Sequence, residues 1–269
     1  MSKLEDFAWH VRKASHQRLN PWQGDKQTIL VPGVQRSGTN MLMDVLDLSL
    51  ETDVFHERDP RAFDSYHLRP YVRQVELRDR SLARVFVLKA LLDSEKTAEL
   101  LSYLEPAKAV WMFRSYDDMV NSNLRNWPGG RNQIEDLMRD PFKTGYRAWG
   151  MTESTLNLIQ SHYKPGMSDA SAIALFWYYR NQLFFDQGLD QDDRVIVVKY
   201  EDVASNPDTT LAWLCERLGL EFTSRMARQI HAKSIGKRKP SGIEPEIRSL
   251  CEQMLARFEE IYITERQKS

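Results

Sequence analysis

The feature that most constrains the fold is an apolar run at residues 28–32 that leads into a glycine-containing turn and an apolar helix pattern ending near residue 46. The segment reads TILVPGVQRSGTNMLMDVL and predicts a buried strand, a tight turn and the first turns of a helix. Backbone N–H groups and the positive end of a helix dipole then converge on one point, which favours a bound anion, most often a phosphate. The alternative is a turn that only joins a strand to a helix.

The residues of this turn depart from the common triphosphate-binding loop, which reads G-x-x-x-x-G-K-[ST]. Gly33 and Gly38 have the correct separation, but Thr39 and Asn40 follow, so the lysine and the magnesium-binding hydroxyl are absent from their usual positions. The cation of this loop is instead Arg36, which precedes the second glycine. We interpret the turn as an anion-binding loop of a different type.

The composition is that of an ordinary globular protein. The chain has 269 residues, of which 42% are hydrophobic and 28% are charged, enough for one large α/β domain or for two small domains. A formal net charge of −1 supplies no global field to attract nucleic acid, so any anion site must be built locally. Cys215 and Cys251 are far apart and indicate neither a disulfide framework nor a metal cluster.

The chain shows no run of eighteen apolar residues and no apolar signal core, so we expect a cytoplasmic protein without a transmembrane segment. The N-terminal twenty or so residues predict a surface helix. We expect its packed side chains to be Leu4, Phe7, Ala8 and Val11.

Short apolar runs alternate with helical patterns along the chain. This order predicts an α/β fold of three layers, with a central parallel sheet of about five strands and helices on both faces. The strands are expected at 28–32, 53–55, 84–88, 109–113 and 194–198, and the helices at 41–48, 94–103, 116–127, 150–187 and 206–218. We expect a single domain with its core at about 27–242, an insertion or lid at 127–167 and a C-terminal helix within 243–269.

A second candidate anion site follows the fourth expected strand. Arg114 comes directly after that strand, at the carboxyl end of a parallel sheet where α/β proteins bind ligands, and Ser122 lies eight residues later. Arginine presents a fixed fork of donors that suits phosphate, and serine adds a hydroxyl donor. A surface ion pair is the alternative interpretation of such a pair.

Together these motifs resemble those of sulfotransferases that use 3′-phosphoadenosine 5′-phosphosulfate, in particular the bacterial and carbohydrate-acting kind. The Arg-Ser-Gly-Thr loop resembles their 5′-phosphosulfate loop, and the Arg-x7-Ser pair resembles their 3′-phosphate motif. The resemblance implies a P-loop-type fold related to nucleotide kinases and metal-independent in-line transfer to an acceptor hydroxyl. The residues it implies for binding of the cosubstrate are Arg36, Ser37, Gly38, Thr39, Asn40, Arg114 and Ser122.

Two further segments belong to this resemblance. Lys237, Arg238 and Lys239 are either a solvated loop or a flap that contributes to the 3′-phosphate site. The Lys199-Tyr200-Glu201-Asp202 segment after the last strand is expected to have a structural role, bracing neighbouring loops.

The acceptor also needs a base, which typically contributes about 10²–10⁴-fold to the rate. Many cytosolic sulfotransferases carry a histidine after the third strand region, but Leu91 stands at that position here. Bacterial and carbohydrate-acting sulfotransferases resemble one another in using a glutamate after the first helix, and this resemblance implies Glu57 as the first candidate, with His56 as the second. Since neighbours in a strand point to opposite sides, we expect only one of them to face the cleft. Lys89 is a candidate second cation on the transferring group.

Other functions remain open at this stage. The first is a kinase-like phosphotransferase that uses ATP and magnesium, and the second is a nucleotide-binding protein without catalysis. Within the sulfotransferase interpretation, the acceptor could be a carbohydrate, a glycolipid or a small metabolite. A nucleic-acid partner is disfavoured by the charge, and the sequence predicts no oligomeric state.

Overall fold

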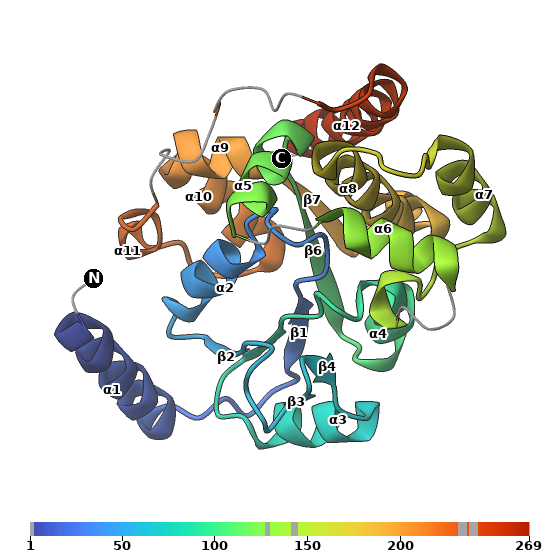
Figure 1. Cartoon of the computed structure of the whole chain (residues 1–269). Coiled ribbons are helices and arrows are strands. Elements are labelled where there is room, and N and C mark those ends of the chain that lie inside the picture. The colour runs from blue at the N-terminus through green and yellow to red at the C-terminus, as the bar shows by residue number, and fades with distance from the viewer. Residues whose placement is uncertain (1–2, 127–129, 141–144, 231–235, 237–241, 269) are drawn as a thin grey trace.

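The computed structural model describes residues 3–126, 130–140, 145–230, 236 and 242–268 (Figure 1). Its centre is a sheet of five parallel strands in the order β2-β5-β1-β6-β7. These are β1 (Gln27–Leu30), β2 (Thr52–Phe55), β5 (Val85–Leu88), β6 (Ala107–Phe113) and β7 (Val195–Lys199). Each of the five predicted strands is present within two residues of its expected bounds, so the predicted α/β fold is confirmed.

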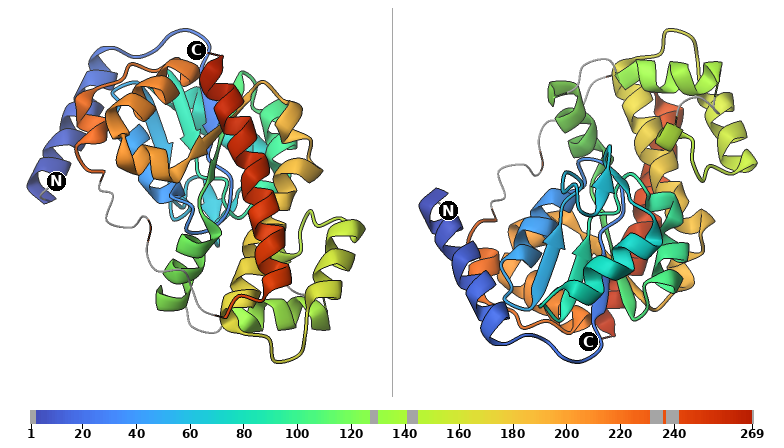
Figure 2. Two further views of the ribbon diagram at one scale, coloured as in Figure 1. Left: turned by 90° about the horizontal axis from the view of Figure 1, so that it is seen from above. Right: turned by 90° about the horizontal axis from the view of Figure 1, so that it is seen from below.

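Helices cover both faces of this sheet, as the three views in Figures 1 and 2 show. One face carries α2 (Thr39–Asp47), α9 (Tyr200–Ser205) and α10 (Pro207–Leu218). The other carries α4 (Thr97–Tyr103), α8 (Asp169–Asp186) and α12 (Pro245–Gln267). Burial from both sides explains why β5 is a run of four apolar residues, each with no exposed surface.

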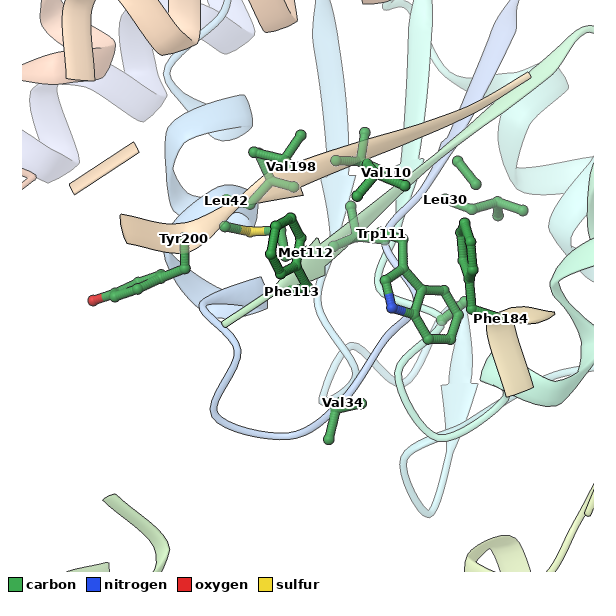
Figure 3. Close-up of a cluster of buried hydrophobic side chains, with 14 of the residues drawn as sticks. Leu30, Val34, Leu42, Val110, Trp111, Met112, Phe113, Phe184, Val198 and Tyr200 are labelled. Carbon is green, nitrogen blue, oxygen red and sulfur yellow. The ribbon is translucent and has the colours of Figure 1, made fainter. Parts of the chain in front are cut away.

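Aromatic side chains join the sheet to α8 and α12. Trp111 of β6 meets Phe184 of α8 edge to face, with ring centroids 5.3 Å apart (Figure 3). Phe113 of the same strand stacks on Phe258 of α12 at 5.4 Å. The Trp111 indole N–H also donates to Asn181 Oδ1 at 3.3 Å, which satisfies the one polar atom of this buried ring.

The remaining elements lie at the edges of this core. A small hairpin and α3 follow β2, and short helices flank the other strands. Their bounds are β3 (Phe63–Asp64), β4 (His67–Leu68), α3 (Tyr71–Arg80), η1 (Ser94–Lys96), α5 (Tyr116–Asn126), η4 (Leu189–Gln191) and α11 (Ser224–Ala227).

The region expected as a lid contains α6 (Gly130–Arg139), η3 (Gly145–Arg147) and α7 (Glu153–His162), and α6 packs on α8. The prediction of one long helix over 150–187 was wrong, because α7 and α8 are separate helices. Pro165 lies between them and cannot donate a backbone hydrogen bond, and Gly166 adopts a φ of 77° that helices exclude.

The N-terminal helix α1 (Lys3–Leu19) forms as predicted, but the prediction of its packed face was wrong. Trp9 and Lys13 are its buried side chains, and both bind Asp47 at the C-terminal end of α2. Trp9 Nε1 donates to the Asp47 carbonyl at 3.2 Å, and Lys13 Nζ lies 2.6 Å from Asp47 Oδ1. The side chains expected to pack are exposed: Leu4, Phe7, Ala8 and Val11.

Candidate active site

The loop between β1 and α2 is held in a conformation that few residues adopt. Gly38 has a φ of 97°, and a Cβ there would lie 2.4 Å from Tyr200 Cδ2 and 3.2 Å from Met112 Cε. Only glycine fits so close to the Tyr200 ring. Arg36 has a φ of 69°, an uncommon value for a residue with a side chain and one typical of strained functional loops.

The start of α2 faces a cavity of about 420 Å³. Gly38 is the N-cap and has no side chain, so it cannot cap the backbone N–H groups of the first turn. Thr39, Asn40 and Met41 line the cavity beside those N–H groups. The helix dipole adds a partial positive charge at this end, so the cavity is suited to an anion.

The two predicted anion motifs meet in this cavity. Because β1 and β6 are neighbours in the sheet, the loops that follow them lie side by side. Arg36 Nε donates to Ser122 Oγ at 3.0 Å, and Arg114 Nη1 donates to the Arg36 carbonyl at 3.2 Å. Arg36, Arg114 and Ser122 all line the cavity. Residues 78 or more positions apart in sequence therefore form one site.

Positive charge is concentrated here. Burial lowers the pKa of Arg36, and the neighbouring guanidinium groups of Arg114 and Arg125 lower it further. Arg114 is buried and lies over the Tyr200 ring, with Cζ 4.2 Å from the ring centroid; Asp118 is 3.8 Å from its Nη2. A bound anion would relieve the repulsion among these cations.

Residues after β7 brace this arrangement, in agreement with the structural role expected of the segment from Lys199 to Asp202. Glu201 Oε1 accepts the N–H of Ser115 at 3.0 Å and so holds the start of α5. Burial raises the pKa of Glu201, although the Ser115 N–H and the Arg114 charge oppose that rise. Tyr200 does more than brace, because its ring also lines the cavity.

Glu57 and Lys89 form a second cluster, at the carboxyl ends of the neighbouring strands β2 and β5. Lys89 Nζ lies 2.7 Å from Glu57 Oε2 and donates to Asn40 Oδ1 at 2.6 Å. The Lys89 side chain is 2% exposed and that of Glu57 is 23% exposed. Lys89 thus connects the candidate base to the start of α2, where the anion cavity lies.

His56 has different surroundings from Glu57. Its Nε2 lies 3.8 Å from Asp44 Oδ1 on the outer part of α2, and its side chain is 39% exposed. The two candidate bases therefore have separate partners, and only Glu57 is linked to the residues that line the cavity.

Lys237, Arg238 and Lys239 lie outside the described residues. The preceding Gly236 is described, and its N–H donates to Asp118 Oδ2 at 3.1 Å. Since Asp118 also faces Arg114, the chain reaches the neighbourhood of the candidate 3′-phosphate site at this point.

Sequence reasoning did not assign four lining residues to the site: Met41, Arg125, Asn126 and Tyr200, the last of which was given only a structural role. Arg125 and Asn126 follow Ser122 by three and four positions on α5, a spacing that places side chains on one helix face. That spacing was a usable signal. No such signal exists in the sequence for Met41, because an apolar residue in an amphipathic helix is expected in the core.

Across the described parts of the chain, no set of three or more His, Cys, Asp or Glu side chains is arranged to hold a metal ion. Within the same ranges, no helix combines the length and the apolar character needed to cross a bilayer. Cys215 and Cys251 are both buried and unpaired with each other.

The fold and the site define a class: parallel α/β proteins that bind a phosphate-like anion at the carboxyl end of the first strand, beside a second basic loop. The chain belongs to the sulfotransferase domain family, whose family model matches residues 26–241. No curated protein matches the sequence.

Three solved structures illustrate what the chain is similar to. The sulfotransferase domain of the Synechococcus PCC 7002 olefin synthase has 13% identity and a TM-score of 0.49, covering 88% of this chain and 97% of that one. An Alicyclobacillus acidocaldarius sulfotransferase has 18% identity and a TM-score of 0.48, covering 90% and 96%. A mouse sulfotransferase complexed with PAP has 15% identity and a TM-score of 0.39, covering 95% and 89%.

Proposed function

We propose that the protein transfers the sulfuryl group of 3′-phosphoadenosine 5′-phosphosulfate to an acceptor hydroxyl. The family supports sulfuryl transfer in general. The observation that carries the choice of donor is the 3.0 Å contact between Arg36 Nε and Ser122 Oγ, which joins two anion motifs in one cavity. A nucleotide with separate anionic groups at its 5′ and 3′ positions needs two such motifs close together.

The donor is held by charge and by backbone N–H groups. In this proposal Arg36 and the first turn of α2 bind the 5′-phosphosulfate, and Arg114, Ser122 and Arg125 bind the 3′-phosphate. Negative charge develops on the bridging oxygen as the sulfur–oxygen bond breaks. Arg36 stabilises that charge without having to move far, as a preorganised donor should.

Glu57 is the proposed general base. The acceptor oxygen attacks sulfur, its proton passes to the Glu57 carboxylate, and the bond between sulfur and the bridging oxygen breaks. The electron pair of that bond leaves with adenosine 3′,5′-bisphosphate. The proton transfer requires a carboxylate that is ionised before the reaction, and the Lys89 ammonium lies 2.7 Å from that carboxylate.

Lys89 has a second proposed role. Its ammonium contacts Asn40 at the start of α2, next to the proposed place of the sulfuryl group. An incoming sulfuryl group competes with Glu57 for that ammonium. We infer that Lys89 turns toward the sulfuryl oxygens as the donor binds, which releases the carboxylate to act on the acceptor. Charge neutralisation by Arg36 and Lys89 means that this mechanism calls for no divalent cation.

We propose a carbohydrate, a glycolipid or a small metabolite as the acceptor. All three present a hydroxyl group, which is what Glu57 would deprotonate. The helices of the 127–167 region, proposed as a lid, stand beside the carboxyl end of the sheet in Figure 1 and would border the bound acceptor.

The proposal is tested by thermal unfolding with adenosine 3′,5′-bisphosphate, in parallel with ATP and magnesium, each with and without a chelator. A ligand present at one hundred times its dissociation constant adds about 2.7 kcal/mol to the stability of the folded state. We expect the bisphosphate to raise the melting temperature with or without chelator, and the Arg36→Ala variant to lose that rise. A rise only with ATP and magnesium would favour a kinase and overturn the proposal.

A further inference from the structure

A second cavity, of about 500 Å³, lies between α1 and α11. Its lining includes Arg12 and Trp9 of α1 and Arg225 and Arg228 at α11. An adjoining hollow of about 300 Å³ is lined by the same four residues. We call these four residues the arginine pocket. The pocket shares no lining residue with the nucleotide cavity.

In the part of the chain that the structure describes, the three arginines of the pocket have no acidic partner at ion-pair distance. Among the described residues, no carboxylate lies within 4.0 Å of the guanidinium nitrogens of Arg12, Arg225 or Arg228, whereas Arg84 pairs with Glu51 at 2.6 Å. Glu51 borders the adjoining hollow, but its carboxylate accepts hydrogen bonds from the Arg84 guanidinium and from the backbone N–H of Glu221. Glu5 also lines the pocket, so three guanidinium groups face one carboxylate there.

Trp9 positions two of these arginines. Arg225 Cζ lies 4.4 Å from the centroid of the indole ring, and Arg12 Cζ lies 5.8 Å away. The ring is itself fixed, because Trp9 is 7% exposed and its Nε1 donates to the Asp47 carbonyl. A cation–π contact orients a guanidinium group but uses none of its N–H donors. The guanidinium N–H groups of Arg12 and Arg225 therefore stay available to donate hydrogen bonds to an external acceptor.

We propose that the arginine pocket is a second anion site that binds a phosphate or sulfate monoester. Three arginine forks match the several oxygens of a tetrahedral oxyanion better than the two oxygens of one carboxylate. A volume of about 500 Å³ is larger than one such ion needs, so the pocket has room for the organic part of an ester. The site is independent of the proposed transferase reaction, since it uses none of its residues.

The test is calorimetric titration with inorganic tripolyphosphate at physiological ionic strength. The nucleotide cavity is first disabled by Arg36→Ala with Arg114→Ala, so that binding reports on the pocket. We expect this background to bind tripolyphosphate, and the added changes Arg12→Gln, Arg225→Gln and Arg228→Gln to weaken binding at least about tenfold.

The matched control removes the same charge elsewhere, with Arg73→Gln, Arg80→Gln and Arg139→Gln in the same background. Binding that is absent, or that falls equally in the two sets of variants, would overturn the proposal. If the first set fails to fold, Arg228→Gln alone replaces it, because Arg228 is exposed and has no contact with the Trp9 ring. That single change must still weaken binding measurably.

A phosphate monoester can come from a soluble molecule or from a lipid headgroup, and sedimentation with vesicles separates the two sources. The vesicles are phosphatidylcholine with and without phosphatidic acid. Sedimentation only with phosphatidic acid, lost when Arg12, Arg225 and Arg228 are changed, would identify a headgroup. It would also give a reason for the exposed Leu4 and Phe7 of α1. Tripolyphosphate binding without sedimentation would identify a soluble ester.

Discussion

At the scale of single residues, the pairing of Glu57 with Lys89 leads to the most direct test of the proposed chemistry. Glu57→Gln keeps the shape of the side chain but removes the basic oxygen. We expect the turnover rate to fall at least about a hundredfold. The affinity for adenosine 3′,5′-bisphosphate should stay the same, because Glu57 does not line the nucleotide cavity. Turnover measured beside calorimetric binding checks both expectations.

His56→Ala is the matched control for that change. His56 is half-exposed and faces Asp44, so its loss should alter turnover by less than a few-fold. If His56→Ala lost turnover while Glu57→Gln kept it, the base would have been assigned to the wrong neighbour.

Lys89 should contribute to stability as well as to turnover. Lys89→Met removes a buried ammonium and leaves Glu57 Oε2 without its ionic partner. Breaking a buried pair in this way costs about 3 kcal/mol in the free energy of unfolding. Adding Glu57→Gln should restore part of that loss, because the orphaned charge is then gone. Urea unfolding of the two single variants and the double variant measures the coupling; additive losses would contradict a direct pair.

Arg114 separates the two halves of the nucleotide site. Arg114→Ala should weaken adenosine 3′,5′-bisphosphate by at least about tenfold and adenosine 5′-phosphate by much less, because a charge-assisted phosphate contact is lost only with the first. Competition binding with both nucleotides measures the ratio. Equal losses would mean that the 3′-phosphate is bound elsewhere.

For single residues, the sequence could indicate which side chains come together where those side chains lie beside strand ends. Arg36, Arg114 and Ser122 each follow a strand closely enough for the sheet to bring them together. The partner of Lys89 was not predictable, because residues 32 positions apart meet only through the pairing of β2 with β5. Tyr200 was assigned only a structural role for the same reason. It follows β7 and Gly38 follows β1, and the two residues meet only because β6 pairs with both strands.

At the scale of elements, the turn from β1 into α2 depends on Gly38. Gly38→Ala places a methyl group against the Tyr200 ring at a φ of 97°. The backbone strain costs about 1–2 kcal/mol and the overpacking about 1–3 kcal/mol. We therefore expect a loss of about 2–5 kcal/mol in the free energy of unfolding, together with weaker nucleotide binding. Urea unfolding and calorimetry measure the two effects.

Gly188→Ala is the control for this prediction. Gly188 also has a positive φ, of 68°, but a Cβ there meets nothing within 4 Å. It should lose only the backbone part, about 1–2 kcal/mol, and leave nucleotide binding unchanged. Equal losses at the two glycines would show that the Tyr200 ring moves aside.

Elements were predictable where burial alone dictates their sequence. A strand covered on both faces is mostly apolar, and each of the five predicted runs is a strand. The face of α1 was not predictable by this rule. Leu4, Phe7 and Val11 are exposed, and the attachment of the helix depends on Trp9 and on a buried lysine, Lys13, that pairs with Asp47 of α2. The break before α8 had a signal in Pro165 and Gly166 that the helical periodicity obscured.

At the scale of the whole molecule, α2 connects the two proposed anion sites. Its N-terminal end lines the nucleotide cavity. Its C-terminal end carries Asp47, whose backbone carbonyl accepts the N–H of Trp9 in the arginine pocket. The dipole of α2 favours an anion at its N-terminal end. At its C-terminal end the dipole favours donors, and there the Asp47 carbonyl accepts hydrogen bonds from Trp9 and Lys13. Damage at Asp47 should therefore loosen α1 and leave the nucleotide cavity unaltered.

This separation leads to a prediction for Asp47→Asn. Burial, the largest influence, would raise the pKa of Asp47, but Lys13 and His10 outweigh it and hold the pKa below its usual 3.8. A depressed carboxylate pKa contributes stability above the unfolded value, and that contribution is lost as the pH falls through the folded value. The variant should lose about 3 kcal/mol in the free energy of unfolding at neutral pH, because Lys13 stays buried without its counter-charge. The difference from wild type should shrink as the pH falls below 3.8.

Trypsin cleavage within α1 provides the second readout for this variant. Cleavage after Arg12 or Lys13 should become faster, while the affinity for adenosine 3′,5′-bisphosphate stays at the wild-type value. The Trp9 indole donates to the backbone carbonyl of residue 47, which the substitution keeps, so tripolyphosphate binding at the arginine pocket should weaken only through the loosening of α1, which carries Arg12. A variant that loses nucleotide binding instead would show that the two ends of α2 are coupled, and that the cavity depends on the N-terminal helix.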